Sequence, residues 1–385
     1  MNIRNATLCF LFVQLIAIAA CAQEAALAKS KKGWGYIRKD NSWLISPRFE
    51  DIESDLIFGG KIPTTTIGLF SEGLVRYSDH GLYGYLNSDG VNVVPAKFQD
   101  ARDFNDSLAA ARKGVQWGFI DKKGEWVVKP IYDDIVSFQS GFAAVKINGK
   151  WGYIDKRGKL VIEPVYKEAY RFRENLALVK SGGKWGFIDK QGAFIIQPIY
   201  KSAFSFNNGI ARVETSDGWG FIDTAGKILI KPAFGFAEIF VGSFARVKIH
   251  DGWSYIDIEG KIISKDSYSN AEDFSDGAAR VRTTEIYWGY IGSDMKWIIR
   301  PVYENAQDFI NGIARVRQGL TWFFINKKGE RLFNMEFQKA EDFHEGLACV
   351  RTKEGWGYLK ENGEWFIPPQ FANCKDFYDI SETLK

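Results

Sequence analysis

The sequence predicts an all-β protein made of tandem repeats of short antiparallel strands, arranged like a β-propeller. The first observation is a tryptophan-glycine step at one spacing, because Trp117, Trp151, Trp185 and Trp219 each lie 34 residues after the last. Exact or degenerate copies of the step bring the array to about ten units, at Trp34, Tyr83, Trp253, Trp288, Trp322 and Trp356. The second observation is the two-residue alternation of apolar and polar residues in each unit, which is typical of strands. Such units bury their apolar faces only against their neighbours.

Each regular unit is expected to hold four short strands, the content of a propeller blade. In the unit of Trp151, residues 151–155 form a strand, Asp155 to Gly158 form a tight turn, and residues 160–162 form the returning strand, which Pro164 should end. A segment that ends at Phe172 and residues 176–180 form a second hairpin. The glycine beside each tryptophan is expected where a neighbouring sheet comes close.

The two ends of the array suggest that it closes into a ring. The first unit begins at Trp34, in its third strand, and the last residues, Phe377 and 380–384, lie where the first two strands of a unit belong. The termini could therefore complete one blade together. Because propellers usually have about four to eight blades, an open superhelical β-solenoid array or two smaller rings remain alternatives.

The N-terminal residues predict export from the cytoplasm. Residues 1–20 combine Arg4 with a short apolar stretch, as in a signal peptide. The segment Ile18-Ala-Ala-Cys21 resembles the lipobox of bacterial lipoproteins, and this resemblance implies lipidation of Cys21 and an outer-membrane location. Cleavage after Ala22, which would give a periplasmic or secreted protein, also fits. We expect a linker over residues 21–32 and one array over residues 33–385.

Composition narrows the function classes. The chain has 50 Lys and Arg against 47 Asp and Glu, a balance that gives no general electrostatic footprint for nucleic acid. The three histidines occupy unrelated repeat positions, so no catalytic residues are expected. The turn aspartates lack the clustered oxygen ligands of a calcium site, and neither a metal nor a cofactor is expected. A disulfide between Cys349 and Cys374 is compatible with an oxidising compartment but is not implied.

Two columns of aromatic residues run through the array. The first lies 15 residues or so after each tryptophan, at Phe49, Phe98, Tyr132, Tyr166, Tyr200, Phe234, Tyr268, Tyr303, Phe337 and Phe371. The second comprises Phe104, Phe138, Phe172, Phe206, Phe240, Phe274, Phe309, Phe343 and Phe377. Because both columns occur in nearly every unit, we expect them to form the core between units, with stacking platforms for sugars or peptides as the alternative.

The candidate ligand-binding residues form two further sets. Arg212, Arg246, Arg280 and Arg315 share one repeat position and could bind carboxylate or phosphate groups. The alternative is a ladder of ion pairs within hairpins, Asp273 with Arg280 and Asp308 with Arg315. The second set lies on the returning strand and offers either a rim for carbohydrate or peptide or packed apolar positions: Trp43, Trp126, Trp297 and Trp365.

Departures from the regular unit mark further places of interest. Residues 55–67 are an insertion in the first unit, which predicts a loop on the binding face or a tolerated surface excursion. Asp266 and Met335 replace the proline of their units, so the C-terminal part of the array is expected to be less regular.

The segments Lys150-Trp-Gly-Tyr-Ile-Asp-Lys-Arg-Gly-Lys159 and Lys184-Trp-Gly-Phe-Ile-Asp-Lys-Gln-Gly192 resemble the WG-repeat (KWG) family of bacterial proteins. The resemblance covers essentially everything after residue 30, and it implies a binding or interaction scaffold without defined catalytic residues. The predicted function is a non-enzymatic cell-envelope scaffold, a monomer with a protein or peptide partner. The alternatives are a carbohydrate-binding surface protein and an envelope enzyme with a site in a central channel.

Overall fold

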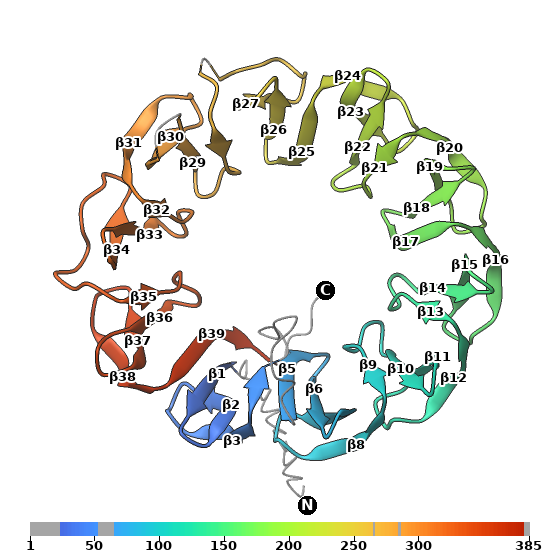
Figure 1. Ribbon diagram of the computed structural model, residues 1–385, viewed down its shortest axis with the longest axis horizontal. Helices are drawn as coiled ribbons and strands as arrows, with labels where there is room; N and C mark the ends of the chain where they lie inside the picture. Colours follow the sequence, from blue (N-terminus) through green and yellow to red (C-terminus); the bar gives the residue numbers. More distant parts are fainter. Residues whose placement is uncertain (1–23, 53–64, 265, 284–285, 381–385) are drawn as a thin grey trace, which may run out of the picture.

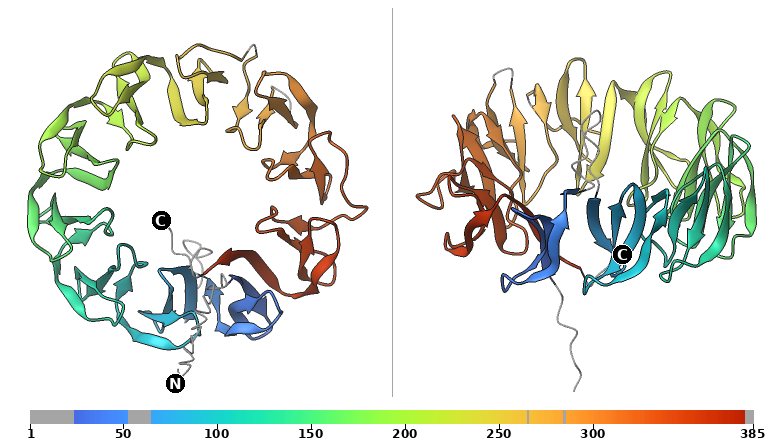
Figure 2. Two further views of the ribbon diagram at one scale, coloured as in Figure 1. Left: turned by 180° about the vertical axis from the view of Figure 1, so that it is seen from behind. Right: turned by 60° about the horizontal axis from the view of Figure 1, so that its bottom comes forward.

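The computed structural model describes residues 24–52, 65–264, 266–283 and 286–380. Ten small sheets stand around a central channel, and consecutive sheets lie side by side as the blades of one ring (Figures 1 and 2). The predicted propeller-like fold is therefore confirmed in its closed form, with ten blades, rather than as an open array or two rings. Residues 1–20, Cys21 and the 55–64 part of the insertion lie outside the described residues. No helix in the described part is long and apolar enough to cross a membrane.

The strands fall into four positions from the channel outwards. The innermost strands are mostly two residues long: β4 (Asp51–Ile52), β9 (Asp100–Ala101), β13 (Asp134–Ile135), β17 (Glu168–Arg173), β21 (Ser202–Ala203), β25 (Phe236–Val241), β28 (Asn270–Ala271), β32 (Asn305–Ala306), β35 (Lys339–Ala340) and β39 (Asn373–Asp379). The second strands are β1 (Glu24–Ser30), β6 (Leu74–Asp79), β10 (Ala109–Lys113), β14 (Phe142–Ile147), β18 (Leu176–Ser181), β22 (Ile210–Thr215), β26 (Phe244–Ile249), β29 (Ala278–Arg282), β33 (Ile313–Gln318) and β36 (Leu347–Arg351). One blade has a fifth strand, β5 (Thr65–Ser71), which pairs in parallel with β4.

The third strands carry the tryptophan-glycine step. They are β2 (Gly33–Arg38), β7 (Leu82–Asn87), β11 (Gln116–Ile120), β15 (Lys150–Asp155), β19 (Lys184–Ile188), β23 (Gly218–Asp223), β27 (Gly252–Ile256), β30 (Trp288–Gly292), β34 (Thr321–Asn326) and β37 (Trp356–Lys360). The outermost strands are β3 (Trp43–Phe49), β8 (Asn92–Phe98), β12 (Trp126–Tyr132), β16 (Leu160–Tyr166), β20 (Phe194–Tyr200), β24 (Ile228–Phe234), β31 (Trp297–Tyr303) and β38 (Trp365–Phe371).

Both ends of the described chain build the closing blade, in the order β3-β2-β1-β39. In the described residues, the C-terminal part supplies the innermost strand, and β1 from the N-terminal part takes the second position, where a second C-terminal strand was expected. The predicted linker over residues 21–32 is wrong for its larger part, because Glu24–Ser30 is the second strand and pairs with both β2 and β39. Its small apolar residues Ala25, Ala26, Leu27 and Ala28 are buried, so this segment is an interior strand of the ring.

The tight turn after the tryptophan strand forms as predicted. Gly158 has a φ of 78° and donates its N–H to the Asp155 carbonyl oxygen at 2.9 Å. The glycine beside tryptophan is required inside its own blade, because a Cβ on Gly152 would lie 2.4 Å from the Ile162 carbonyl oxygen. This corrects the expected close approach of a neighbouring sheet. Pro164 does not end β16, because the strand lies at the outer edge, where a missing N–H is tolerated.

The core lies between the blades. The first aromatic column is buried throughout, and all but two members of the second are buried, so the ring is held together by layers of aromatic rings. Tyr153 and Phe172, for example, meet across a blade boundary with ring centroids 4.9 Å apart. The two blades in which Asp266 and Met335 replace proline are β25-β26-β27 and β32-β33-β34, and both have three strands instead of four. The expected irregularity therefore removes their outermost strands.

Candidate functional site

The contact between two consecutive blades, which we call a joint, is where the candidate arginines lie. Arg246 extends from β26 to the next blade, where Nη1 donates to the Ala271 carbonyl oxygen at 2.5 Å and Nε to Asp273 Oδ1 at 2.6 Å. Burial alone would lower the pKa of Arg246, but the hydrogen bond and charge of Asp273 raise it overall. The guanidinium group therefore stays charged and fixed between two blades.

The other three candidate arginines make the same bridge at their joints, and so does Arg76, which bonds the Ala101 carbonyl oxygen and pairs with Asp103. Arg280 bonds the Ala306 carbonyl oxygen at 2.6 Å and Asp308 at 2.7 Å. Arg315 bonds the Ala340 carbonyl oxygen and, at 2.7 Å, Asp342. Arg212 bonds the Ala237 carbonyl oxygen at 2.6 Å and pairs with Glu238.

The four candidate arginine side chains are only 10% to 17% exposed. The ion-pair ladder therefore exists, but it runs between blades. The expected hairpin pairs of Asp273 with Arg280 and Asp308 with Arg315 are wrong, because the acids face the preceding blade.

A tyrosine supplies a second donor beside the arginine. Arg246 and Tyr255 are cross-strand partners, and the Tyr255 hydroxyl donates to the Glu272 carbonyl oxygen at 2.6 Å. Burial raises the pKa of Tyr255, so the hydroxyl keeps its proton. We call the two partnered residues the bridging pair. Corresponding tyrosine bonds run from Tyr85, Tyr153, Tyr290 and Tyr358.

The joint before the closing blade replaces the arginine by a disulfide. Cys349 takes the arginine position, as the partner of Tyr358, and Cys374 takes the alanine position in β39. The two cysteines are bonded, with their Cα atoms 6.3 Å apart. Asp376, at the place of Asp273, has therefore lost its arginine, and its buried Oδ1 has no hydrogen-bond partner. Burial, followed by the charge of Glu341, raises the pKa of Asp376 to about 6.

The joint between the β17–β20 and β21–β24 blades, which we call the open joint, has none of these bonds. Its bridging pair is Leu178 and Phe187, neither of which can donate a hydrogen bond. Ser205 stands at the position that Asp273 and Asp308 take in bridged joints. The tips of the two blades are still tied, because Gly209 donates its N–H to Glu174 at 2.8 Å. The inner part of the joint therefore lacks both bonds of a bridged joint. The joint between the β9–β12 and β13–β16 blades has a similar pair, Ala110 and Phe119, but there Arg102 donates to the Ile135 carbonyl oxygen.

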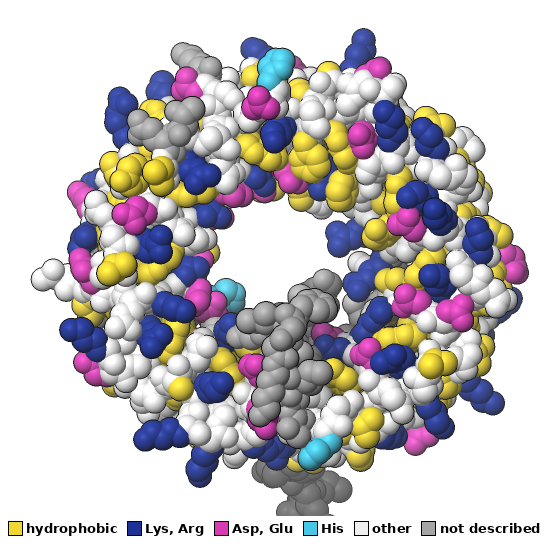
Figure 3. Space-filling model, viewed as in Figure 1, with side chains coloured by type: hydrophobic (Ala, Val, Ile, Leu, Met, Phe, Trp, Pro, Cys, Tyr) yellow, Lys and Arg dark blue, Asp and Glu magenta, His cyan; other side chains and the backbone are white. Residues whose placement is uncertain are grey.

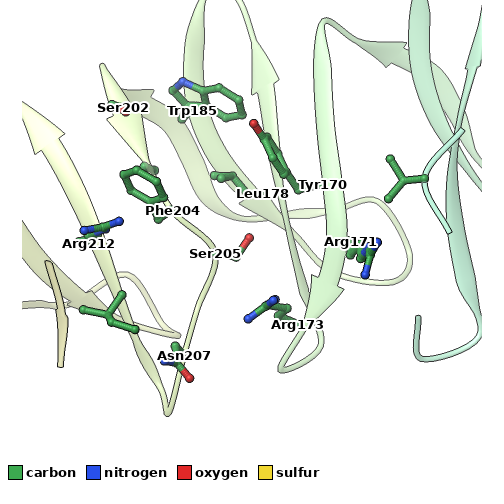
Figure 4. Close-up of a pocket in the computed structure, with 13 residues that line it drawn as sticks. Tyr170, Arg171, Arg173, Leu178, Trp185, Ser202, Phe204, Ser205, Asn207 and Arg212 are labelled. Atoms are coloured by element: carbon green, nitrogen blue, oxygen red, sulfur yellow. The ribbon is translucent and has the colours of Figure 1, made fainter. Parts of the chain in front are cut away.

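A cleft of about 530 Å³ occupies the open joint (Figure 4). Leu178, Trp185 and Phe204 give it apolar walls, and the hydroxyl of Ser205 and the amide of Asn207 add polar groups. In Figure 4, Arg173 lies between the tip of the β17 hairpin and the Ser205–Asn207 segment of the next blade. The arrangement combines apolar contacts with hydrogen-bond donors, as small-ligand and peptide sites do.

Two exposed arginines border this cleft, Arg171 and Arg173. Neither has an acidic partner within the described ranges of the chain. The pKa of Arg171 is lowered by partial burial and then by repulsion from Arg102 and Arg173. Lys and Arg side chains gather on this side of the channel in the space-filling view (Figure 3). The open joint is therefore cationic and has unused donors.

The WG containing repeat model matches ten segments of the chain: residues 34–55, 83–114, 117–151, 151–185, 185–218, 219–253, 253–284, 288–319, 322–355 and 356–379. The chain belongs to the WG containing repeat family. No relative was found among curated protein sequences.

Solved structures match this WG-repeat propeller at low identity. A structure of the eukaryotic initiation factor matches with a TM-score of 0.56 and 10% identity, over 95% of this chain and all of that chain. BamB from Moraxella catarrhalis matches with a TM-score of 0.35 and 12% identity, over 69% of this chain and 94% of that one. The dihydro-heme d1 dehydrogenase NirN matches with a TM-score of 0.39 and 13% identity, over 94% and 75%.

The candidate tryptophans of the WG-repeat propeller lie between blades and are half-buried. Trp43 packs against Phe371, Trp126 against Phe98 and Trp297 against Tyr268, with ring centroids 5.5 to 6.5 Å apart. Trp365 packs against the cluster that contains Phe337. Each ring thus covers the preceding blade, and a role in ligand binding stays a prediction. In the described residues, no three His, Cys, Asp or Glu side chains are placed to hold a metal ion.

Sequence reasoning missed the residues of the open joint. Leu178 and Phe187 looked like ordinary core residues, and Arg171 and Arg173 did not belong to the basic column. A comparison of the bridging pairs would have narrowed the search to two joints, because among the described residues only Leu178 with Phe187 and Ala110 with Phe119 lack both the arginine and the tyrosine.

Proposed function

We propose that this WG-repeat propeller is a non-enzymatic binding scaffold of the cell envelope, which holds a protein or peptide partner on the channel side of its ring. The observation that carries the proposal is the open joint. Trp185 is packed into the core of this joint and is only 8% exposed. Beside it, the joint has a cleft of about 530 Å³ in place of the arginine and tyrosine bonds of a bridged joint. A ring in which most joints are bonded by arginine, tyrosine or a disulfide, and which keeps a cleft at this joint, is suited to positioning a ligand on a rigid frame.

Two features support an envelope location. The N-terminal residues have the pattern of an exported protein, as described above. The Cys349–Cys374 disulfide suits an oxidising compartment, since such bonds are rare in proteins of the reducing cytosol. Cys21 remains the proposed site of lipidation.

The binding role is tested by site-specific photocrosslinking in living cells. A photoreactive side chain at Asn207, inside the cleft, should yield a discrete adduct with a protein or peptide, identified by mass spectrometry. The same side chain at Lys296, an exposed turn residue, serves as the control. A missing adduct at Asn207, or the same adducts at both positions, would contradict the proposal.

Location is tested separately by fractionation. Wild-type protein should sediment with the outer membrane, and the Cys21→Ser variant should not. A soluble periplasmic wild-type protein that begins at Gln23 would remove the lipid anchor and leave the scaffold in place. Recovery in the cytoplasm with Cys349 and Cys374 reduced would contradict the envelope location.

A further inference from the structure

We propose that the open joint binds an extended acidic peptide, which adds to the free edge of β17 and places carboxylates on Arg171 and Arg173 and an apolar side chain in the cleft. The inference rests on the proposed scaffold function and names its ligand class. It follows from three properties of the joint: a strand edge that pairs with no second strand, a reversed charge and a cleft with an unused buried donor.

The strand edge is available to a further strand because β17 pairs with no strand other than β18 in the described residues, although the Tyr170 carbonyl oxygen accepts a hydrogen bond from the Tyr153 hydroxyl. At six residues, Glu168–Arg173 is longer than the two-residue innermost strands of most blades. An edge of this length presents a row of backbone donors and acceptors to which an extended peptide can add. The exposed side chains Tyr170, Arg171 and Arg173 project from it.

The charge is reversed relative to the bridged joints. Arg171 follows β17 Ala169 by two residues, as Asp273 follows Ala271 and Asp342 follows Ala340. At bridged joints this acid holds the arginine of the preceding blade. Arg171 instead lines the cleft and has no acidic partner among the described residues, and the preceding blade has Ala144 at its arginine position. The nearby acid Glu174 is engaged by the N–H of Gly209. Carboxylates are the complementary groups for two unpaired guanidinium groups.

The cleft offers an apolar site that also contains one hydrogen-bond donor without a partner, the Nε of Arg212. Its walls are Leu178, Trp185 and Phe204. Arg212 lines the cleft with a side chain that is 10% exposed, and its buried Nε has no hydrogen-bond partner. An apolar side chain of a bound strand would be covered here, while the backbone beside it pairs with β17.

Acidic carbohydrate is the less favoured ligand. Sugars stack on open aromatic faces, but Trp185 is 8% exposed, and the Arg212 guanidinium lies 3.8 Å from the centre of the Phe204 ring. Tyr170 and Phe204 are more exposed, but Tyr170 packs against Trp185 and the Arg212 guanidinium covers Phe204. An extended peptide fits the joint better, because it can pair with the edge of β17, contact Arg171 and Arg173 through its acids and place an apolar side chain in the cleft.

The test is fluorescence anisotropy with the mature protein and a labelled eight-residue peptide that alternates glutamate and valine. We expect saturable binding that weakens at high salt, at least tenfold weaker binding of the matched glutamine peptide, and loss on N-methylation of alternate peptide amides. The Arg171→Gln, Arg173→Gln double variant should bind at least tenfold more weakly. Arg157→Gln, a turn residue of the β13–β16 blade, should bind as wild type does.

A second variant closes the joint without removing a cation. Leu178→Arg with Ser205→Asp recreates the bridge of Arg280 and Asp308, and it should abolish peptide binding while the melting temperature is kept or raised. The proposal is overturned if the acidic peptide does not bind, if both variants bind it as wild type does, or if polygalacturonate binds in its place. A crosslinked envelope partner at Asn207 whose capture survives Arg171→Gln and Arg173→Gln would keep the scaffold and refute this ligand class.

Discussion

The arc of the ring from β22 to β36 and the arc from β14 to β21 are built from the same repeat but are held together differently. In the first arc, every joint has an arginine that reaches the next blade, and three of the four arginines also meet an aspartate. In the second arc, Ala144 and Leu178 take the arginine position, and Arg171 and Ser205 take the aspartate position. Both arcs keep the aromatic core, so the core is sufficient for the ring, and the polar residues of each joint are free to serve either stability or binding.

The joint before the closing blade is held in a third way, by the Cys349–Cys374 disulfide. Its disruption should cause the largest loss of stability. Deletion of residues 373–385 removes β39, the disulfide and the fully buried Phe377. We expect the free energy of unfolding to fall by more than about 5 kcal/mol, measured by chemical denaturation. The full-length Cys349→Ser, Cys374→Ser variant should lose about 3 kcal/mol, the disulfide's share. An unchanged denaturation midpoint after the deletion would show that closure does not stabilise the ring.

The next effect separates the two arcs directly. Arg280→Met leaves Asp308 and the Ala306 carbonyl oxygen without their partner, so we expect a loss of about 3 kcal/mol of unfolding free energy. Arg171→Met in the open arc removes an unpaired, exposed charge and should change stability by less than about 0.5 kcal/mol. Equal losses for the two variants would refute the distinction between bridged and open joints.

Asp376, which has no arginine partner at the disulfide joint, should make the stability of the protein depend on pH. Its folded pKa of about 6 lies above the ordinary value of 3.8, so the folded state holds a proton that the unfolded state releases. Stability should therefore fall as pH rises from 4 to 6. Asp376→Asn should stabilise the protein by about 1 to 3 kcal/mol at pH 7 and by nothing at pH 4 or below. Denaturation curves at the two pH values check this, and a pH-independent effect would remove Asp376 as the cause.

The smallest change in stability is expected when a bridge is built into the open joint. Leu178→Arg with Ser205→Asp should raise the unfolding free energy by about 1 kcal/mol, because the new ion pair must offset the loss of the apolar Leu178 side chain. The matched single variant Leu178→Arg leaves a charge without its acid and should be less stable than the double variant. If the single and double variants have the same stability, the bridge has not formed.

Much of the fold could be predicted from the sequence because equivalent residues form the same strands in nearly every repeat. The aromatic columns and the turn at Gly158 follow from local patterns, and so does the all-β class. The position of β1 was missed because Leu27 is the only large apolar side chain among residues 25–28, although Ala26-Leu27-Ala28 occupies the place of Ala177-Leu178-Val179 in a regular unit.

The joints could not be predicted from one repeat, because a period does not say which neighbouring unit a side chain faces. Asp273 is closer in sequence to Arg280, yet it bonds Arg246 of the preceding blade. The disulfide did leave a signal. Cys349 and Cys374 are 25 residues apart, the same separation as Arg246 and Ala271 or Arg315 and Ala340. Aligning the cysteines with these bridges predicts their contact.

The most direct test of the account is amide hydrogen exchange of the whole ring, with and without the alternating glutamate-valine peptide. We predict that the peptide slows exchange at residues 169–173 and 203–207, which contribute to the lining of the cleft, and leaves the equivalent residues 271–275 and 306–310 of the bridged joints unchanged. Protection at the bridged joints, or no protection at residues 169–173 when the peptide is bound, would contradict it.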